Sequence, residues 1–275
     1  MNGSVSKVIL MGTRPACLSA LNILHTISGV QIQALVTRPI SEEKKPYWDS
    51  KLITKAEALG ISVVKSLEEL VLNEIDFALS VNYWKIIPSS FIQSCNFGIV
   101  NLHHSFNLSI KGRMCATRAI QACEEGGLNF TGSSLHYINE HLDAGPVIQS
   151  LPSLIRKTDT AYEVFQRTEK LGRKLLETWL PTLPFRKVPA CLPENPLRQF
   201  PLVGKNLTDI KGDLLKNPAH FYNIVRSYEF RNLFEPAFFE DQFGNKEYLA
   251  TKNQGENSTI LVIDETRKIY RMNRS

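Results

Sequence analysis

The sequence has few cysteines and none of the spacings that build a disulfide framework or hold a structural metal ion. Its five cysteines are an odd number, and no two form a Cys-x-x-Cys pair. We therefore expect reduced thiols in a cytoplasmic protein, with no zinc site. No apolar run approaches the roughly 18 residues that span a bilayer, and the first residues carry no apolar leader. The sequence predicts neither a membrane protein nor a secreted one.

A strong charge of one sign is also missing. The 275 residues carry a formal net charge of +5, with 43% hydrophobic and 21% charged residues. This composition is ordinary for a soluble globular protein whose length allows one large domain and a smaller one. The weak positive charge is compatible with an anionic substrate, but by itself it does not indicate nucleic acid.

Several common catalytic and nucleotide-binding motifs are absent. Residues 12–15 follow the first apolar run and read Gly-Thr-Arg-Pro, which is neither G-x-G-x-x-G nor a P-loop. A G-x-S-x-G elbow is missing, which argues against Ser105 as a nucleophile. His103 and His104 are adjacent and have no His-x-x-x-His partner, so a metal site is the disfavoured alternative.

What is present is an alternation of apolar runs with helix-like stretches. β-rich runs at residues 7–11, 30–36, 61–64 and 76–81 are separated by stretches with apolar residues at helical spacing. This alternation predicts βαβ units, and therefore an α/β fold with a doubly wound, mostly parallel sheet. Sites in such sheets lie at the carboxyl ends of the strands. The helical spacing of apolar residues at 161–180 predicts a long amphipathic helix that lies on the sheet.

A cluster of prolines divides the chain. Six prolines fall between residues 181 and 201, a density that neither a helix nor the inside of a sheet accepts. We expect a catalytic domain at residues 1–185, a proline-rich linker at residues 186–201 and a small α+β domain at residues 202–275. In the last of these, the pattern predicts a helix at 218–227 and strands around 247–250 and 259–263.

The candidate site lies in the second half of the larger domain. Asn101 and His103 follow the apolar run at residues 97–100, and Asp143 precedes an Ala-Gly-Pro turn. An amide can donate to a developing oxyanion, an imidazole can move a proton, and a carboxylate can orient the imidazole. In an extended chain Asn101 and His103 point to one side and His104 to the other. Each residue alone is more simply a cap, a buried histidine or a turn former, but together they predict acyl transfer.

In these residues the chain resembles the folate-dependent formyltransferases. The family pattern Asn-x-His-Pro-Ser corresponds to residues 101–105, its Gly-Thr-x-x-His element to 132–136 and its Leu-Asp-x-Gly-Pro to 142–146. Two elements depart from the pattern, because the proline is His104 here and the usual Leu-Pro is Asn107-Leu108. The resemblance continues, in the manner of the methionyl-tRNA formyltransferase branch, at residues 11–13, 36–39 and 83–88.

The resemblance implies a co-substrate and a set of site residues. The co-substrate is N10-formyltetrahydrofolate, the reaction is formyl transfer to a primary amine, and no metal is involved. The catalytic residues implied are Asn101, His103 and Asp143. The backbone of residues 84–87 and of residues 139–143 is expected to cradle the pterin, with apolar contacts from Ile87 and Leu142. The residues implied in folate binding are Trp84, Lys85, Ile86, Ile87, Asn139, Glu140, His141 and Leu142.

The C-terminal residues bear on the amine acceptor. Residues 202–275 contain 11 Lys and Arg against 10 Asp and Glu, a difference of +1, which makes a poor face for nucleic-acid phosphates. Residues 221–226, 234–238 and 244–246 resemble the tails of sugar-nucleotide N-formyltransferases, which often support a homodimer. We therefore expect a nucleotide-linked small-molecule amine, namely an amino sugar of a nucleoside-diphosphate sugar, and no nucleic acid.

Other readings stay open on the sequence. The acceptor amine of a formyltransferase could be hydroxyornithine destined for a siderophore, or it could be methionyl-tRNA. A different class of answer is a folate-binding regulatory module without chemistry, against which the intact set of Asn101, His103 and Asp143 argues. An assay of amine-dependent folate turnover separates these readings.

Overall fold

The computed structural model describes residues 5–38, 47–70, 74–124, 129–183, 190–191, 204–207, 217–240, 243–244, 246–251, 260–263 and 269–272. The chain forms two compact units, the first from residues 1–112, 132–152 and 168–197 and the second from residues 113–131, 153–167 and 198–275. Each unit combines segments that are separated in the chain, whereas the expected domains are continuous ranges. The expected domain boundaries stay a prediction. Apart from residues 190 and 191, the expected linker at 186–201 lies outside the described residues.

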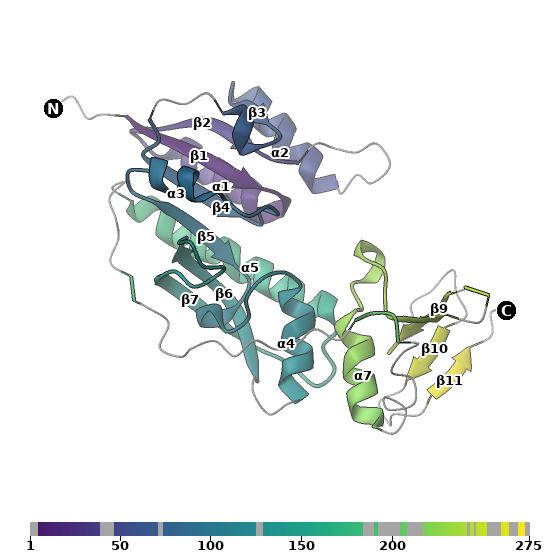
Figure 1. Ribbon diagram of the computed structural model, residues 1–275. Helices are drawn as coiled ribbons and strands as arrows, with labels where there is room; N and C mark the ends of the chain where they lie inside the picture. Colours follow the sequence, from purple (N-terminus) through teal and green to yellow (C-terminus); the bar gives the residue numbers. More distant parts are fainter. Residues whose placement is uncertain are drawn as a thin grey trace. The chain divides into compact units, whose positions relative to one another are not determined.

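The first unit is built on a seven-stranded sheet with the order β3-β2-β1-β4-β5-β6-β7 (Figure 1). The pairs from β3 to β5 are parallel, while β5 and β6 are antiparallel. The chain moves outward from β1 in one direction and then crosses to the other side, so the predicted doubly wound, mostly parallel sheet is confirmed. Its strands are β1 (Ser6–Gly12), β2 (Val30–Val36), β3 (Ser62–Val64), β4 (Phe77–Val81), β5 (Ile99–His103), β6 (Phe130–Tyr137) and β7 (Val147–Leu154).

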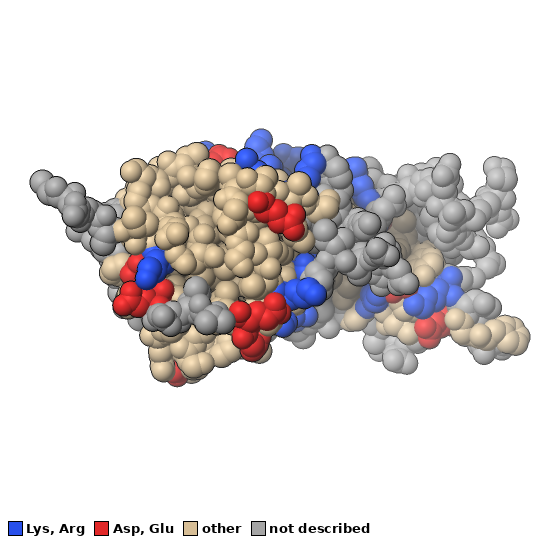
Figure 2. Space-filling view, turned by 90° about the horizontal axis from the view of Figure 1, so that it is seen from above, with Lys and Arg blue, Asp and Glu red and all other residues tan. Residues whose placement is uncertain are grey.

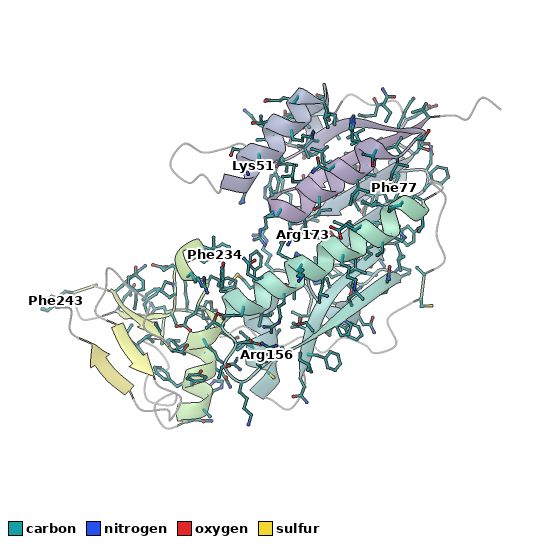
Figure 3. The ribbon with its side chains drawn as sticks, turned by 180° about the vertical axis from the view of Figure 1, so that it is seen from behind. Lys51, Phe77, Arg156, Arg173, Phe234 and Phe243 are labelled. Atoms are coloured by element: carbon teal, nitrogen blue, oxygen red, sulfur yellow. The ribbon has the colours of Figure 1, made fainter. Side chains whose placement is uncertain are left out.

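Helices cover both faces of this sheet because its strands are apolar on both sides. One face packs residues such as Leu10, Leu79 and Leu102 against α1 (Arg14–Thr26), α2 (Tyr47–Ala58) and the end of α5 (Ala161–Trp179). The other face packs residues such as Ile9 and Ile99 against α3 (Ser89–Ser94). Figure 1 shows α3 in front of the sheet, and Figure 3, from behind, shows α1 and α5 in front.

The alternation of side chains along β5 decides where the site lies. Leu102 belongs to the core cluster on the α5 face, whereas Ile99 belongs to the cluster on the α3 face. Asn101 and His103 therefore point to the α3 face. The strand itself runs from Ile99 to His103, so Asn101 is its middle residue and His103 its last.

The second unit contains α4 (Cys115–Glu124), α7 (Pro218–Ser227) and a four-stranded sheet of order β11-β10-β9-β8. The predicted helix at 218–227 is confirmed, and it begins where the Asn217 side chain accepts a hydrogen bond from the His220 N–H. Its apolar face packs Phe221 and Ile224 into a separate core. The strands are β8 (Phe238–Glu240), β9 (Lys246–Ala250), β10 (Ile260–Ile263) and β11 (Ile269–Met272).

Short 3-10 turns complete the described elements. They are η1 (Leu67–Glu69), η2 (Phe106–Leu108), η3 (Leu180–Thr182) and η5 (Arg231–Leu233). Of the helices that the structure describes, none combines the length and the apolar character needed to cross a membrane.

Candidate active site

The register of β5 against its two neighbours places three polar side chains in one row. Asn101 lies opposite Ser80 of β4 on one side and opposite His136 of β6 on the other. Residues in register on adjacent strands point to the same face. The row therefore lies on the α3 face of the sheet, in the middle of the first unit.

The Asn101 side chain is oriented by both neighbours. Its Oδ1 accepts a hydrogen bond from the Ser80 hydroxyl at 2.8 Å, and its Nδ2 donates to His136 Nε2 at 3.1 Å. The amide nitrogen carries two protons, and this bond uses one of them. The second proton is therefore offered to another acceptor, which is what an oxyanion donor requires.

His136 is a buried neutral imidazole that fixes the direction of these bonds. Its Nδ1 lies 2.9 Å from the Tyr137 carbonyl, which can only accept, so Nδ1 carries the proton and Nε2 accepts from Asn101. Burial, with a smaller effect from the charge of a protonated His103, lowers the pKa of His136 to about 4. Sequence reasoning gave His136 no role, although it stands in a recognised motif, because the β5–β6 register was not known.

His103 is held at the end of β5 and is 8% exposed. Its Nε2 lies 2.6 Å from the Ile110 carbonyl, to which it donates, and 3.7 Å from Asp143 Oδ2. The imidazole rings of His103 and His136 meet edge to face with centroids 6.2 Å apart. The structure thus brings a second histidine beside the predicted one, on the same face of the sheet.

Asp143 reaches between the two histidines from the loop that joins β6 to β7. Its Oδ1 lies 3.8 Å from His136 Nε2, while its Oδ2 accepts a hydrogen bond from the Gly112 N–H at 2.7 Å. The carboxylate side chain is 11% exposed. Asn101, His103 and Asp143, which the sequence predicted as one site, are therefore close together in the structure.

The loop that carries Asp143 depends on a close backbone approach at Gly145. A Cβ at this position would lie 1.8 Å from the Tyr137 carbonyl oxygen, so only glycine fits. Asp143 itself has a φ of 42°, in the left-handed region. This tight turn folds the loop back, which allows the carboxylate to reach the strand.

The segments predicted for folate binding carry two exposed apolar side chains. Ile86 in the segment after β4 is 88% exposed, and Leu142 is 61% exposed. Ile87, for which an apolar contact with the pterin was expected, is partly buried and packs against the core cluster on the α3 face. Near Leu142, the Asn139 side chain accepts a hydrogen bond from the His141 N–H at 3.0 Å, which shapes the turn. The folate contacts of Trp84, Lys85, Ile86, Ile87, Asn139, Glu140, His141 and Leu142 stay predictions.

His104 points to the other face, as its position in an extended strand predicts. Its ring contacts Ser133 and Glu169 on the α5 side of the sheet. No group of three or more His, Cys, Asp or Glu side chains that could hold a metal ion occurs in the part of the chain that the structure describes.

Comparison with known proteins adds to this geometry. The family described as formyl transferase matches residues 32–180 of the chain. A methionyl-tRNA formyltransferase of Listeria monocytogenes serotype 4a (strain HCC23) is 27% identical over 284 residues, which cover 96% of this chain and 86% of that protein.

Solved structures share the fold at low sequence identity. A 4-N formyltransferase from Francisella tularensis superposes with a TM-score of 0.73 and 16% identity, over 92% of this chain and all of that one (100%). An N-formyltransferase from Helicobacter canadensis, in complex with folinic acid and dTDP-3-aminofucose, gives a TM-score of 0.61 and 18% identity, over 82% and 81% of the two chains.

Proposed function

The chain belongs to the formyl transferase family, and we propose that it moves a formyl group from N10-formyltetrahydrofolate to an amino sugar linked to a nucleoside diphosphate. That it is a folate-dependent formyl-transfer enzyme follows from its family. The observation that carries the proposed chemistry is the arrangement of Asn101, His103 and Asp143 around His136 on one face of the sheet.

The residues of the site have distinct proposed roles. When bound, the folate supplies the formyl carbonyl that the amine attacks. The Nδ2 proton of Asn101 that His136 does not use is donated to the carbonyl oxygen as it becomes negative. His103, protonated and held by the Ile110 carbonyl, adds a positive charge there and a proton for the leaving nitrogen. Asp143 orients His103 and takes the proton that the amine releases.

His136 supports Asn101 as a neutral partner. With its Nδ1 proton on the Tyr137 carbonyl, its Nε2 can only accept, and this aligns the Asn101 amide. A protonated His136 would offer a proton to Asn101 Nδ2, which cannot accept it. Because the pKa of His136 is lowered to about 4, the accepting form is the one present near neutral pH.

The exposed side chains of Ile86 and Leu142 fit an aromatic co-substrate. Both belong to segments for which the resemblance implies pterin contacts, and both expose most of their surface. A ring system laid against them would remove apolar surface from water, which is favourable by about 25 cal/mol per Å². We propose that the segment of Ile86 and the loop of Leu142 and Asp143 hold the pterin, and that both contribute backbone groups to it.

The proposed acceptor rests on the C-terminal residues and on the relatives. The charge difference of +1 in residues 202–275 is unfavourable for a tRNA backbone. The protein from Helicobacter canadensis, which was solved with dTDP-3-aminofucose, shares the fold over 82% of this chain. Both observations favour a nucleotide-linked amine, and the homodimer and the cytoplasmic location expected with it stay predictions.

Methionyl-tRNA is the second candidate acceptor. The 27% identity to a methionyl-tRNA formyltransferase covers 96% of the chain, including its C-terminal residues. A shared acceptor is therefore a real alternative to the nucleotide-linked sugar.

One assay separates the candidates. The protein is incubated with N10-formyltetrahydrofolate, and release of tetrahydrofolate is followed with nucleotide-linked amino sugars, methionyl-tRNA, hydroxyornithine or no amine. We expect turnover with an amino sugar. Turnover with methionyl-tRNA alone would replace the proposed acceptor, turnover without amine would indicate a hydrolase, and folate binding without turnover would favour a regulatory module.

A further inference from the structure

A second polar cluster surrounds His104, on the α5 face of the sheet. This face is opposite to the one that carries Asn101 and His103. The His104 side chain is 11% exposed, with Nε2 at 3.1 Å from Glu169 Oε1 and Nδ1 at 3.1 Å from the Ser133 hydroxyl. Both ring nitrogens therefore have protein partners. His104 is also where this chain departs from the related pattern, which has a proline at this position.

The hydrogen bonds of the partners determine the protonation of His104. The Ser133 hydroxyl has one proton and donates it to the Thr168 carbonyl at 2.7 Å, so toward His104 it can only accept. His104 Nδ1 must then donate, and Nε2 donates to the Glu169 carboxylate. A ring that donates from both nitrogens is an imidazolium.

Glu169 is an ionised partner for this imidazolium. Its carboxylate also accepts from Asn82 Nδ2 at 3.0 Å and lies 3.9 Å from the Arg14 guanidinium. Burial by itself would raise the pKa of Glu169, but the charge and hydrogen bond of His104, with Arg14 and Asn82, lower it overall. His104 and Glu169 thus form a buried ion pair between β5 and α5.

Helix α5 is shaped to receive the imidazole. Gly172 stands inside this helix, where glycine costs about 1 kcal/mol relative to alanine. A Cβ at Gly172 would lie 3.2 Å from His104 Cε1 and 2.8 Å from Leu102 Cδ2. The missing side chain therefore provides space for the Leu102 side chain and for the edge of the His104 ring.

The turn that follows His104 returns to His103. The Ile110 N–H donates to the Ser105 hydroxyl at 2.7 Å, which closes the turn between residues 105 and 110. The carbonyl of the same Ile110 accepts from His103 Nε2 at 2.6 Å. The orientation of the His103 ring thus depends on where this turn is held.

The turn contains residues in an unfavourable backbone conformation, so contacts with its surroundings must keep it in place. Asn107 and Leu108 have φ values of 46° and 55°, and such left-handed conformations are unfavourable for a residue like Leu108. Residues in such regions persist when their surroundings fix them. One anchor is the burial of Leu108, which is 0% exposed, and another is the pairing of His104 with α5 at the start of the turn.

We propose that His104, as an imidazolium paired with Glu169, is a positioning residue for His103. It ties the end of β5 to α5, and through the turn to Ile110 it sets the ring that carries the proton in formyl transfer. The inference rests on the proposed function only in taking His103 as a catalytic residue.

The test compares His104→Leu with His104→Gln and with His25→Leu, an equivalent change at an exposed histidine in α1. For His104→Leu we expect kcat to fall by roughly 10- to 100-fold, the effect of misplacing a catalytic group by about 1 Å, with little change in KM. His104→Gln, whose amide can donate to Glu169, should recover most of the loss. His25→Leu should have no effect.

Two further readouts separate positioning from a general loss of stability. The ring resonances of His103, identified by their disappearance in His103→Gln, should shift in His104→Leu and remain in place in His25→Leu. Glu169→Gln combined with His104→Leu should cost no more than the worse single change, because the two residues act as a unit.

The outcomes are distinct. A lower melting temperature with an unchanged kcat and an unchanged His103 signal would overturn the proposal. If the wild-type protein transferred formyl to no amine, the proposed function would have failed, and the His103 signal alone would decide whether His104 positions it. If His104→Leu did not fold, His104→Gln would decide. A kcat well below the wild-type value together with an unshifted His103 signal in that variant would overturn the proposal.

Discussion

At the scale of single residues, the proposed role of Asn101 depends on which of its side-chain hydrogen bonds are already made. Asn101 accepts from Ser80 and donates once to His136, and these two bonds fix the direction of the remaining N–H. Asp143 receives a backbone N–H from Gly112, so the carboxylate is held in place before any ligand binds. Groups that are oriented in advance stabilise a transition state without paying for reorganisation.

Removing a member of the trio should abolish most turnover. We expect Asn101→Ala, His103→Ala and Asp143→Ala each to lower kcat by roughly 10²- to 10³-fold, the typical loss for an oxyanion donor or an acid–base group. The melting temperature should change little. Steady-state kinetics with the preferred amine measure the effect, and a His103→Ala variant with wild-type kcat would contradict the assignment.

His136 should make stability depend on pH. Its folded pKa of about 4 lies below the ordinary value of 6.5, so between these values the unfolded chain binds more protons than the folded one. The free energy of unfolding should therefore decrease as the pH falls from 6.5 towards 4, by up to about 1.4 kcal/mol per pH unit.

The pH effect is measured by comparing two proteins. Urea unfolding at several pH values would be followed for the wild type and for His136→Gln, which keeps a donor and an acceptor but does not titrate. The difference in slope between the two isolates His136 from other titrating groups. Equal slopes would show that His136 is not the neutral, buried group described above.

At the scale of elements, the loop between β6 and β7 is the most constrained part of the site. Gly145 packs on the Tyr137 carbonyl so closely that a methyl group would force the backbone apart. We expect Gly145→Ala to displace Asp143, to lower kcat by at least about 10-fold and to destabilise the protein by roughly 2 kcal/mol.

A matched alanine substitution provides the control. At Gly204 the added Cβ would meet nothing within 4 Å, so Gly204→Ala should leave kcat and the melting temperature near the wild-type values. Circular dichroism and steady-state kinetics on both variants measure the contrast. An active Gly145→Ala would mean that the loop can move without disturbing the site.

At the scale of the whole molecule, charge bears on the acceptor. Figure 2 shows one face, on which Lys and Arg side chains of the described residues lie in small groups with acidic groups between them. A protein that neutralises 6–10 phosphates typically loses about 10³- to 10⁵-fold in affinity between 50 and 200 mM salt. A nucleoside diphosphate has far fewer phosphates than this.

The salt dependence of kcat/KM should therefore be shallow. For a nucleotide-linked amine we expect a decrease of less than roughly 10-fold over the same salt range. The measurement is kcat/KM for the preferred acceptor at several salt concentrations, with the folate saturating. A decrease near 10³-fold would indicate a polyanionic acceptor such as tRNA.

Patterns within the sequence are enough to predict the local elements and to propose the chemistry of Asn101, His103 and Asp143. Helix α5 and the strands β1 to β4 follow from the spacing of apolar residues, because this periodicity records which side of an element is buried. Asn101, His103 and Asp143 were predicted from residue types in a recognisable order. The opposite direction of His104 followed from the alternation of side chains along an extended strand.

The distant residues that surround Asn101, His103 and His104 could be identified only from the folded chain. Ser80 and His136 join Asn101 through strand register, and register depends on how separate strands pair and not on either strand alone. Glu169 meets His104 because α5 crosses the opposite face at Gly172. Contacts between residues far apart in the chain depend on the sheet order and on packing, so a single sequence predicts the catalytic groups but not the neighbours that orient them.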